Sequence, residues 1–260
     1  MKIVVSPNAV ALGKRAAEET AEILRAGIAR DGIGRIVLST GASQFTTLEA
    51  LTAIDGIDWK HVEMFHLDEY IGLPQDHPAS FRKYLQERFV DKTGIEKVHF
   101  VPSDPKCVAA VGEELRRAPV HVGLIGIGRN AHIAFNDPPA DFDTDEPYLV
   151  VTLVPECRRQ QVAEGWFAKE EEVPAQAITM SVRQIMRCEH VIAPVPYPEK
   201  AEAVRATLET PLDPMTPATM LKTHEHFSLY VDKDSFARVN VQRIVPAEGK
   251  DGYCLRVYTN

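Results

Sequence analysis

The chain has 260 residues, of which 45% are hydrophobic, so it is long enough and apolar enough for a sizeable core and is not a disordered chain. Its formal net charge is −8 and its pI is near 5.6, which argues against nucleic acid or an anionic membrane as a partner, because both require clustered positive charge. A small anionic ligand is still compatible with this charge, since it needs only backbone N–H groups and one or two cations.

The four cysteines are far apart and include no Cys-x-x-Cys pair, which indicates reduced thiols rather than a disulfide scaffold. The first residues lack the apolar segment of a signal peptide, and no run reaches the roughly 18 apolar residues of a membrane span. We therefore expect a cytoplasmic protein without membrane contact. The sequence leaves open whether it is a monomer or a homo-oligomer.

Segments typical of strands and helices alternate along most of the chain. The expected strands cover residues 2–5, 35–38, 62–67, 97–101, 122–125, 149–153, 177–180, 190–194, 226–231 and 254–258. The expected helices cover residues 9–30, 45–54, 80–90, 108–117, 158–167, 182–187, 200–208, 216–223 and 233–240. Without a repeat or a linker, this alternation predicts one three-layer α/β/α domain with a mostly parallel sheet over residues 1–240. Residues 241–260 are expected to be a C-terminal extension that packs on it.

The apolar run at residues 122–125 ends in two glycines, Gly126 and Gly128. Glycines at this position indicate a tight turn or a close approach of the backbone to another group. A dinucleotide fingerprint is a weaker interpretation, because Ala131 stands where the third glycine would fall. The pattern predicts a buried strand whose carboxyl end opens into a loop.

Polar side chains follow in this loop: Asn130, His132 and Asp137. Open α/β sheets place their ligands at the carboxyl ends of strands, so these residues form a candidate site. A histidine that an amide and a carboxylate orient can act as an acid or a base near neutral pH. A purely structural turn explains these residues about equally well when they are taken alone.

A second candidate site follows the strand at residues 35–38. The next residues are Ser39, Thr40, Gly41, Ala42 and Ser43, and a helix comes directly after them. A small, hydroxyl-bearing turn before a helix can bind an anion, because unpaired backbone N–H groups and the helix dipole converge there. The same composition is also typical of a plain helix cap.

Two more residues follow strands in the same manner. Asp68 comes after the strand at 62–67, and it either lies near the histidine loop or caps the next helix. Lys200 begins the helix that follows the strand at 190–194, where it could reach an anion or be merely exposed.

Other features favour structural roles. His224 and His226 could offer two metal ligands on one strand face, but no third ligand with zinc spacing is evident. Trp59 and Trp166 are too isolated to form a stacking platform, so we expect them in the core or at its rim.

Two sequence blocks together resemble the glucosamine-6-phosphate deaminase (isomerase) family. The first is Leu67-Asp-Glu-Tyr-Ile-Gly-Leu-Pro74, followed by His77, Pro78 and Ser80, and the second is Gly126-Ile-Gly-Arg-Asn-Ala-His-Ile-Ala-Phe-Asn-Asp-Pro138. The similarity covers about residues 1–236. The turn at 39–43 stands where this family has its phosphate loop, Lys200 matches a phosphate-contacting lysine, and His224 matches a histidine near the end of the fold.

The resemblance implies a doubly wound fold related to ribose-5-phosphate isomerases. It also implies that an amino-sugar 6-phosphate and water are converted to a ketose phosphate and ammonia. By position, Asp68 is similar to the base that moves a proton between C2 and C1, and His132 to the group that opens the sugar ring. Asn130 and Asp137 then correspond to the orienting partners of that histidine. No metal or organic cofactor is implied, because the substrate nitrogen supplies the electron sink.

The chain departs from the family at several positions. Asp137 stands where glutamate is usual, and because it is one methylene shorter we expect it to need a backbone shift to reach the imidazole. Ala131 replaces a usual glycine, which suggests a changed loop conformation. Arg158 is the nearest candidate for the family's phosphate-binding arginine. The loop at 138–149 lacks the basic residues that bind the allosteric activator in regulated members, so we expect no such regulation.

Two alternatives to the deaminase remain at this point. One is a lactone hydrolase similar to 6-phosphogluconolactonases, although Tyr70 and the Asn136-Asp137-Pro138 segment match the deaminase pattern better. The other is a non-catalytic sugar-phosphate sensor, which the acidic charge and the retention of both Asp68 and His132 disfavour.

Overall fold

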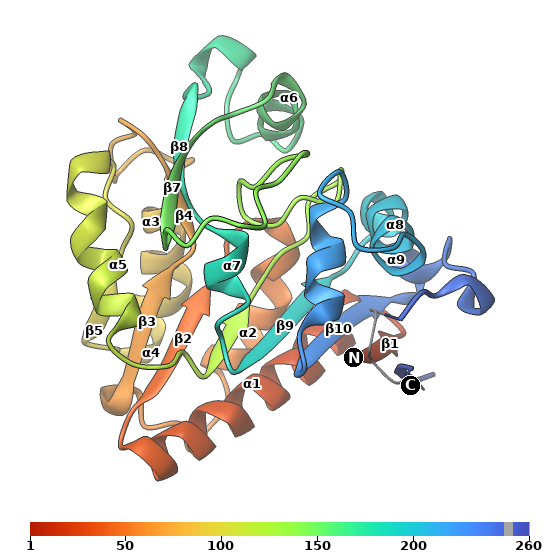
Figure 1. Ribbon diagram of the computed structural model, residues 1–260. Helices are drawn as coiled ribbons and strands as arrows, with labels where there is room; N and C mark the ends of the chain where they lie inside the picture. The colour runs from red at the N-terminus through yellow and green to blue at the C-terminus, as the bar shows by residue number, and fades with distance from the viewer. Residues whose placement is uncertain (247–251, 260) are drawn as a thin grey trace.

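A computed structural model describes residues 1–246 and 252–259 of the chain. Within these residues, an eight-stranded sheet runs through the molecule with every neighbouring pair of strands parallel (Figure 1). In spatial order the strands are β11 (Cys254–Val257), β1 (Lys2–Ser6), β10 (Phe227–Asp232), β9 (His190–Val195), β6 (Val122–Leu124), β2 (Gly34–Leu38), β3 (Val62–His66) and β5 (Lys97–His99). The predicted mostly parallel sheet is confirmed.

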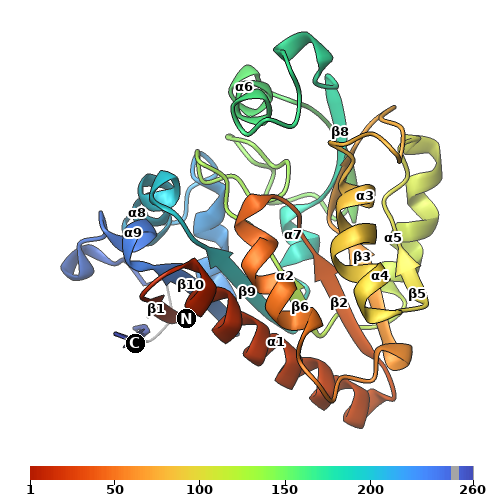
Figure 2. The same ribbon diagram turned by 180° about the vertical axis from the view of Figure 1, so that it is seen from behind.

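Helices cover both faces of this sheet. One face carries α1 (Ala9–Asp31), α2 (Phe45–Thr52), α3 (Phe81–Leu85), the π-helical turn η3 (Gln86–Val90) and α4 (Asp91–Thr93), which stand in front in Figure 2. The other face carries α5 (Val108–Arg116), α7 (Val182–Ile185), α8 (Ala201–Glu209) and the 3-10 helix η7 (Pro217–Thr223). These layers confirm the three-layer α/β/α architecture.

Alternate residues along each strand enter separate cores, because successive side chains of a strand point to opposite faces. In β2, Ile36 and Leu38 pack with α1 and α2, whereas Val37 packs with the helices of the other face. All three side chains have no exposed surface. This explains why several inner strands, such as residues 3–5 of β1 and 191–195 of β9, read as continuous apolar runs rather than as alternating patterns.

The helix α1 follows the sequence signals closely. The Asn8 side chain accepts a hydrogen bond from the Ala11 N–H and so caps the first turn. The helix ends at Gly32, whose φ of 74° is costly for residues with a Cβ. Ala16, Ala17 and Ala21 are fully buried, because small side chains let this long helix lie close to the sheet.

A second, three-stranded antiparallel sheet was not expected from the sequence. It contains β4 (Asp68–Tyr70), β8 (Gln176–Met180) and β7 (Tyr148–Thr152), and it stands above the carboxyl ends of the main sheet (Figure 1). The sequence predicts the strands that correspond to β7 and β8 in the common parallel sheet, which is wrong, and it predicts no separate strand at β4. Nothing local in these segments reveals that they pair with each other.

The remaining elements are short. They are η1 (Ala42–Gln44), η2 (Trp59–His61), η4 (Pro105–Cys107), α6 (Pro155–Ala163), η5 (Glu170–Glu172), η6 (Pro198–Lys200), α9 (Lys233–Phe236) and η8 (Val241–Arg243). The helix expected at 233–240 is therefore one turn long, and the one expected at 158–167 begins three residues earlier as α6.

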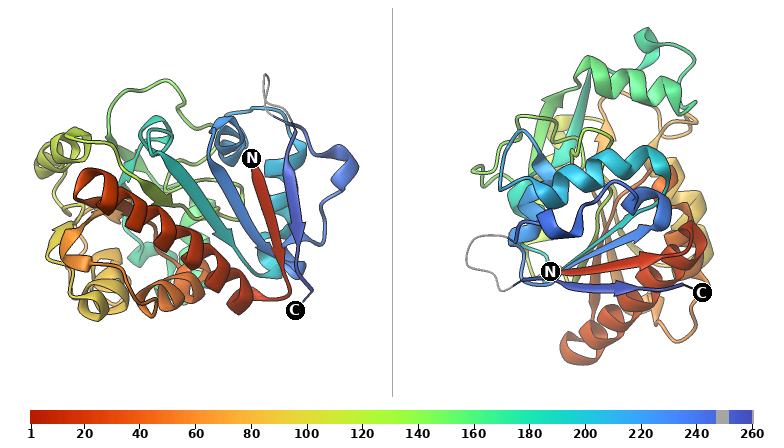
Figure 3. Two further views of the ribbon diagram at one scale, coloured as in Figure 1. Left: turned by 90° about the horizontal axis from the view of Figure 1, so that it is seen from below. Right: turned by 90° about the vertical axis from the view of Figure 1, so that its right-hand side faces the viewer.

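The C-terminal segment adds an edge strand to the sheet. β11 pairs in parallel with β1, and both lie beside the two chain termini in Figure 3. The predicted terminal strand is thus present, although residues 247–251 and 260, which belong to the expected extension, lie outside the described residues. Within the described residues, no helix has the length and apolarity needed to cross a bilayer.

Candidate functional site

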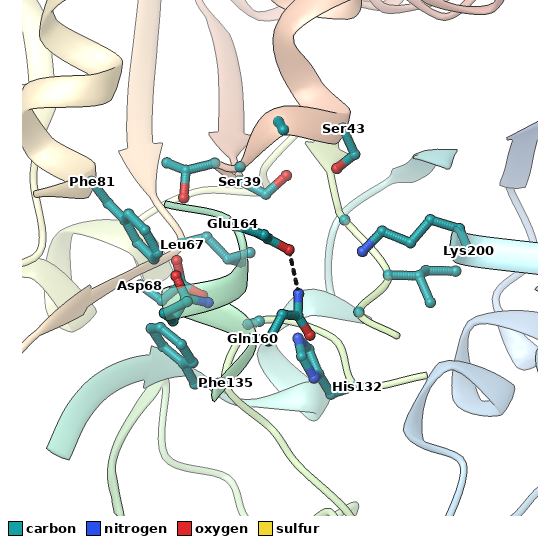
Figure 4. A pocket seen from close by; sticks show the side chains of 18 of the residues that line it. Ser39, Ser43, Leu67, Asp68, Phe81, His132, Phe135, Gln160, Glu164 and Lys200 are labelled. Carbon is teal, nitrogen blue, oxygen red and sulfur yellow. Dashed lines mark hydrogen bonds between the residues drawn. The ribbon is translucent and has the colours of Figure 1, made fainter. Parts of the chain in front are cut away.

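A pocket opens at the carboxyl ends of four neighbouring strands, β9, β6, β2 and β3. The space within it is about 830 Å³ when the open mouth is included. The segments that leave these strands supply most of its walls, as expected for an open α/β sheet. The lining residues that the argument uses are Ser39, Ser43, Asp68, His132, Gln160, Glu164 and Lys200 (Figure 4).

The loop after β6 presents His132 to this pocket. The backbone turns back on itself, since the Gly128 N–H donates to the His132 carbonyl at 2.9 Å. The imidazole lies directly against Gly128, where an added Cβ would come within 2.1 Å of Nε2. Only glycine therefore leaves room for the ring in this position. Ala131 has a φ of 63°, so it takes the left-handed conformation that glycine favours.

Asn130 and Asp137 hold the histidine from behind. Nδ1 of His132 lies 3.2 Å from Oδ1 of Asp137, at an angle that is not that of an aligned hydrogen bond. The Asn130 amide donates to the same carboxylate oxygen at 3.1 Å, and its own oxygen accepts from the His132 backbone N–H at 3.2 Å. Burial would raise the pKa of Asp137, but the neighbouring imidazole and amide outweigh it and lower the pKa. The shorter carboxylate therefore reaches the ring.

Asp68 lies on another wall of the same pocket. It begins β4, where the chain leaves the main sheet, and its side chain is 5% exposed. Burial, followed by repulsion from Glu69, raises its pKa to about 8. The rings of Phe81 and Phe135, which stack at 5.8 Å, line the pocket with it. An acid of this kind can exchange a proton near neutral pH.

Glu69 fixes the start of the following helix rather than facing the pocket. Its carboxylate accepts hydrogen bonds from the Ser80 hydroxyl at 3.0 Å and from the Arg82 N–H at 2.9 Å. The Arg82 guanidinium forms an ion pair with it at 3.2 Å. This buried charge is therefore compensated, and it holds the segment that carries Asp68 against α3.

The opposite wall has the features of an anion site. Ser39, Thr40, Gly41, Ala42 and Ser43 all line the pocket. The Ser39 hydroxyl is buried without a hydrogen-bond partner, and Gly41 has a φ of 100° that turns the chain into η1 and α2. Lys200 also lines this wall and is 8% exposed, and burial lowers its pKa. A buried lysine beside a turn of this kind favours an anionic group.

The structure brings most of the predicted residues together, with one exception. Asn130 and Asp137 touch His132 from outside the pocket lining. Arg158 is not among the lining residues, and its guanidinium donates to the Glu170 carbonyl at 2.7 Å. The structure therefore does not place Arg158 with the other predicted phosphate-binding residues.

Sequence reasoning missed the cover of the pocket, which comes from α6 and the residues after it. These lining residues are Gln160, Gln161, Glu164 and Trp166. Trp166 lies at the rim, as expected for one of the two tryptophans, while Trp59 packs edge-on against Phe89 at 5.3 Å. A run of polar residues on a short helix carries no motif, so only the fold reveals their place.

Candidate metal ligands lie elsewhere. His224 donates through Nε2 to the Cys188 carbonyl, 2.8 Å away, and its Nδ1 accepts from the His226 N–H, which fits the expected structural role. Among the described residues, Glu63, His99 and Glu114 could geometrically hold an ion. Two guanidiniums already neutralise Glu63 there, those of Arg35 at 2.5 Å and Arg117 at 3.2 Å. We therefore assign a structural role, not a metal-binding one, to these three residues.

The fold and the site define an open α/β protein in which Asp68, His132 and the turn at residues 39–43 line one pocket at the carboxyl ends of the strands. A sequence model of the family described as glucosamine-6-phosphate isomerases/6-phosphogluconolactonase matches residues 7–230. A glucosamine-6-phosphate deaminase of Exiguobacterium sibiricum is 34% identical over 220 residues, 82% of this chain and 85% of that one. One of Listeria monocytogenes is 30% identical over 240 residues, 90% and 98% of the two chains. This chain belongs to the glucosamine-6-phosphate isomerase/6-phosphogluconolactonase family.

Solved structures agree with this assignment. A monomeric glucosamine-6-phosphate deaminase, described as a missing link of the NagB superfamily, superposes with a TM-score of 0.82 at 25% identity, covering 92% of this chain and all of that one. The 6-phosphogluconolactonase of Trypanosoma brucei superposes with a TM-score of 0.75 at 17% identity, covering 92% and 98%. The second likeness shows a shared fold only.

Proposed function

We propose that the chain is an amino-sugar phosphate deaminase that converts glucosamine 6-phosphate, or a close analogue, and water to fructose 6-phosphate and ammonia. The observation that carries the proposal is that Asp68 and His132 line one pocket whose opposite wall has the features of an anion site. The names of the most similar relatives support the same reaction.

The phosphate would bind at the turn of residues 39–43 and at Lys200. Anchoring this end of the sugar would hold C1 and C2 near Asp68 and would convert binding energy into orientation. Lys200 is suited to this task because it is buried, and an anion would restore the solvation that its ammonium loses.

His132 would open the sugar ring by moving a proton between the ring oxygen and the C1 hydroxyl. Asp137 and Asn130 hold its ring and backbone in place, so little ordering is needed at the moment of reaction. Asp68 would then remove the C2 proton and deliver it to C1. Water would add to the resulting C2 imine and release ammonia, which leaves the ketone of fructose 6-phosphate.

The direct test is to incubate the purified protein with glucosamine 6-phosphate and to measure ammonia and fructose 6-phosphate together. We expect the two products in equal amounts, and Asp68→Asn is the matched control because it removes the base while keeping the shape of the side chain. Absence of turnover together with tight binding of the sugar phosphate would contradict the proposal and favour a sensor. A 6-phosphogluconolactone hydrolysis assay on the same preparation separates the lactonase alternative.

A further inference from the structure

The end of α6 places a carboxylate over the pocket. Glu164 is the first residue after α6, and Figure 4 shows its side chain among the groups that point into the cavity. The Gln160 amide donates to one of its oxygens at 2.7 Å, and the Trp166 indole N–H approaches the other at 3.3 Å. Two donors therefore orient this exposed carboxylate, and its remaining lone pairs can accept from a ligand.

The position of Glu164 divides the pocket by charge. Lys200 and the turn at 39–43 form a wall that suits an anion, whereas the negative charge of Glu164 repels an anion. The two groups interact across the cavity, because Glu164 raises the pKa of Lys200 against the larger, opposite effect of burial. A ligand with a single negative group gains nothing from Glu164, but a ligand with a phosphate and a cation matches both walls.

The pocket has two other lining carboxylates, and neither is equally suited to a cation. Asp68 keeps its proton up to a pKa of about 8, so it is mostly neutral at pH 7. Glu199 precedes Lys200 directly along the chain in the same helical turn, so its charge is next to the lysine that would hold the phosphate. Glu164 is the carboxylate that two donors fix over the cavity.

We propose that Glu164 is a specificity-determining residue that accepts a hydrogen bond from the charged amine of the sugar phosphate. This inference rests on the proposed function and adds to it a reason why an amine-bearing substrate is selected. A phosphorylated lactone, or the phosphate of a sugar without an amine, offers no cation to Glu164. Charge-assisted hydrogen bonds are the stronger ones, so the amine gains appreciable affinity there.

The test compares two ligands that differ only in the amine and that the enzyme does not convert. These are 2-amino-2-deoxyglucitol 6-phosphate and glucitol 6-phosphate, whose dissociation constants are measured by isothermal titration calorimetry at pH 6.5. We expect the wild-type protein to bind the amine at least tenfold more tightly. In Glu164→Gln, which retains one accepting oxygen but no charge, this ratio should fall to within threefold of unity, and glucitol 6-phosphate should bind no more weakly than before.

Two control variants remove one carboxylate each. Glu156→Gln changes an exposed residue of α6 that pairs with Arg159 and does not line this pocket. Glu199→Gln changes a lining residue on the opposite wall. Both should keep the preference for the amine, although Glu199→Gln is expected to tighten both ligands through Lys200. Thermal melting of each variant shows whether its fold is retained.

The inference is overturned if Glu164→Gln keeps the wild-type ratio, if it weakens both ligands equally, or if the wild-type protein shows no preference for the amine. These outcomes are independent of the proposed reaction. The reaction is judged by ammonia release from glucosamine 6-phosphate by the wild-type protein. Ammonia release with an unchanged ratio in Glu164→Gln would refute only the role of Glu164.

Discussion

The raised pKa of Asp68 can be tested through both activity and stability in the variant Asp68→Asn. Asparagine keeps the size of the side chain but neither titrates nor accepts a proton. If Asp68 is the base, kcat for the deaminase reaction should fall by roughly a thousandfold, within the range that general acid–base groups contribute. In the wild-type protein, kcat/KM should rise with pH up to about 8, because the ionised carboxylate is the active form.

The stability effect follows from the two pKa values of this one group. The unfolded chain releases the Asp68 proton near the model-compound value of 3.8, whereas the folded protein keeps it up to about 8. The stability that this proton gives is therefore complete below 3.8 and is lost as the pH rises through 8. Each pH unit in this window changes the free energy of unfolding by ~1.4 kcal/mol, which amounts to about 4 kcal/mol between pH 5 and pH 8.

The free energy of unfolding is measured by urea denaturation of both proteins at pH 5, 6, 7 and 8. Since asparagine does not titrate, the free energy of unfolding of the variant should rise relative to that of the wild-type protein by about 4 kcal/mol from pH 5 to pH 8. Asp76→Asn, at an exposed position, is the control and should follow the wild-type protein. A difference between Asp68→Asn and the wild-type protein that is the same at every pH would refute a raised pKa at Asp68.

Four further substitutions test the rest of the site. Gly128→Ala should lower kcat roughly a hundredfold by displacing the imidazole of His132. The melting temperature should change little, because the ring can turn away from the added methyl group. An unchanged kcat would show that the ring is not held there. His132→Gln should lower the rate of turnover of the cyclic substrate far more than that of a ring-opened analogue. Equal losses of turnover rate for both would contradict a role in ring opening. Lys200→Met should raise KM for the phosphosugar at least tenfold, and calorimetry with inorganic phosphate should show the same loss. Arg158→Ala should leave KM within about threefold, since its guanidinium bonds to a backbone carbonyl; a large rise in KM would assign Arg158 to the phosphate after all.

Much of the fold could be predicted from the sequence because its signals are local. The cap at Asn8, the left-handed Gly32 and the small buried residues of α1 each act within one or two turns. The inner strands of the main sheet are buried on both faces, so several of them, such as β1 and β9, appear as mostly apolar runs. The pairing of β4, β8 and β7 depends instead on contacts between residues 24 to 111 positions apart, which no local pattern encodes.

The site likewise has features that could be predicted from the sequence and one that could not. Asp68, His132 and the turn at 39–43 each follow a strand of the main sheet, and neighbouring parallel strands bring their carboxyl ends together. Their meeting in one pocket could therefore be predicted. The reach of Asp137 to the imidazole could not, because a distance of 3.2 Å depends on backbone turns such as the positive φ of Ala131.

The second sheet connects the two parts of the site that the main sheet does not explain. The β4 strand begins with Asp68 and pairs with β8, in which Thr179 lies opposite Asp68. The β7 strand, on the other side of β8, ends three residues before α6, whose end carries Glu164. The acid that would move the proton and the carboxylate that would recognise the amine are thus attached to one small sheet. A change in the position of this sheet would alter catalysis and substrate selection together, while the phosphate wall, which belongs to the main sheet, would stay in place.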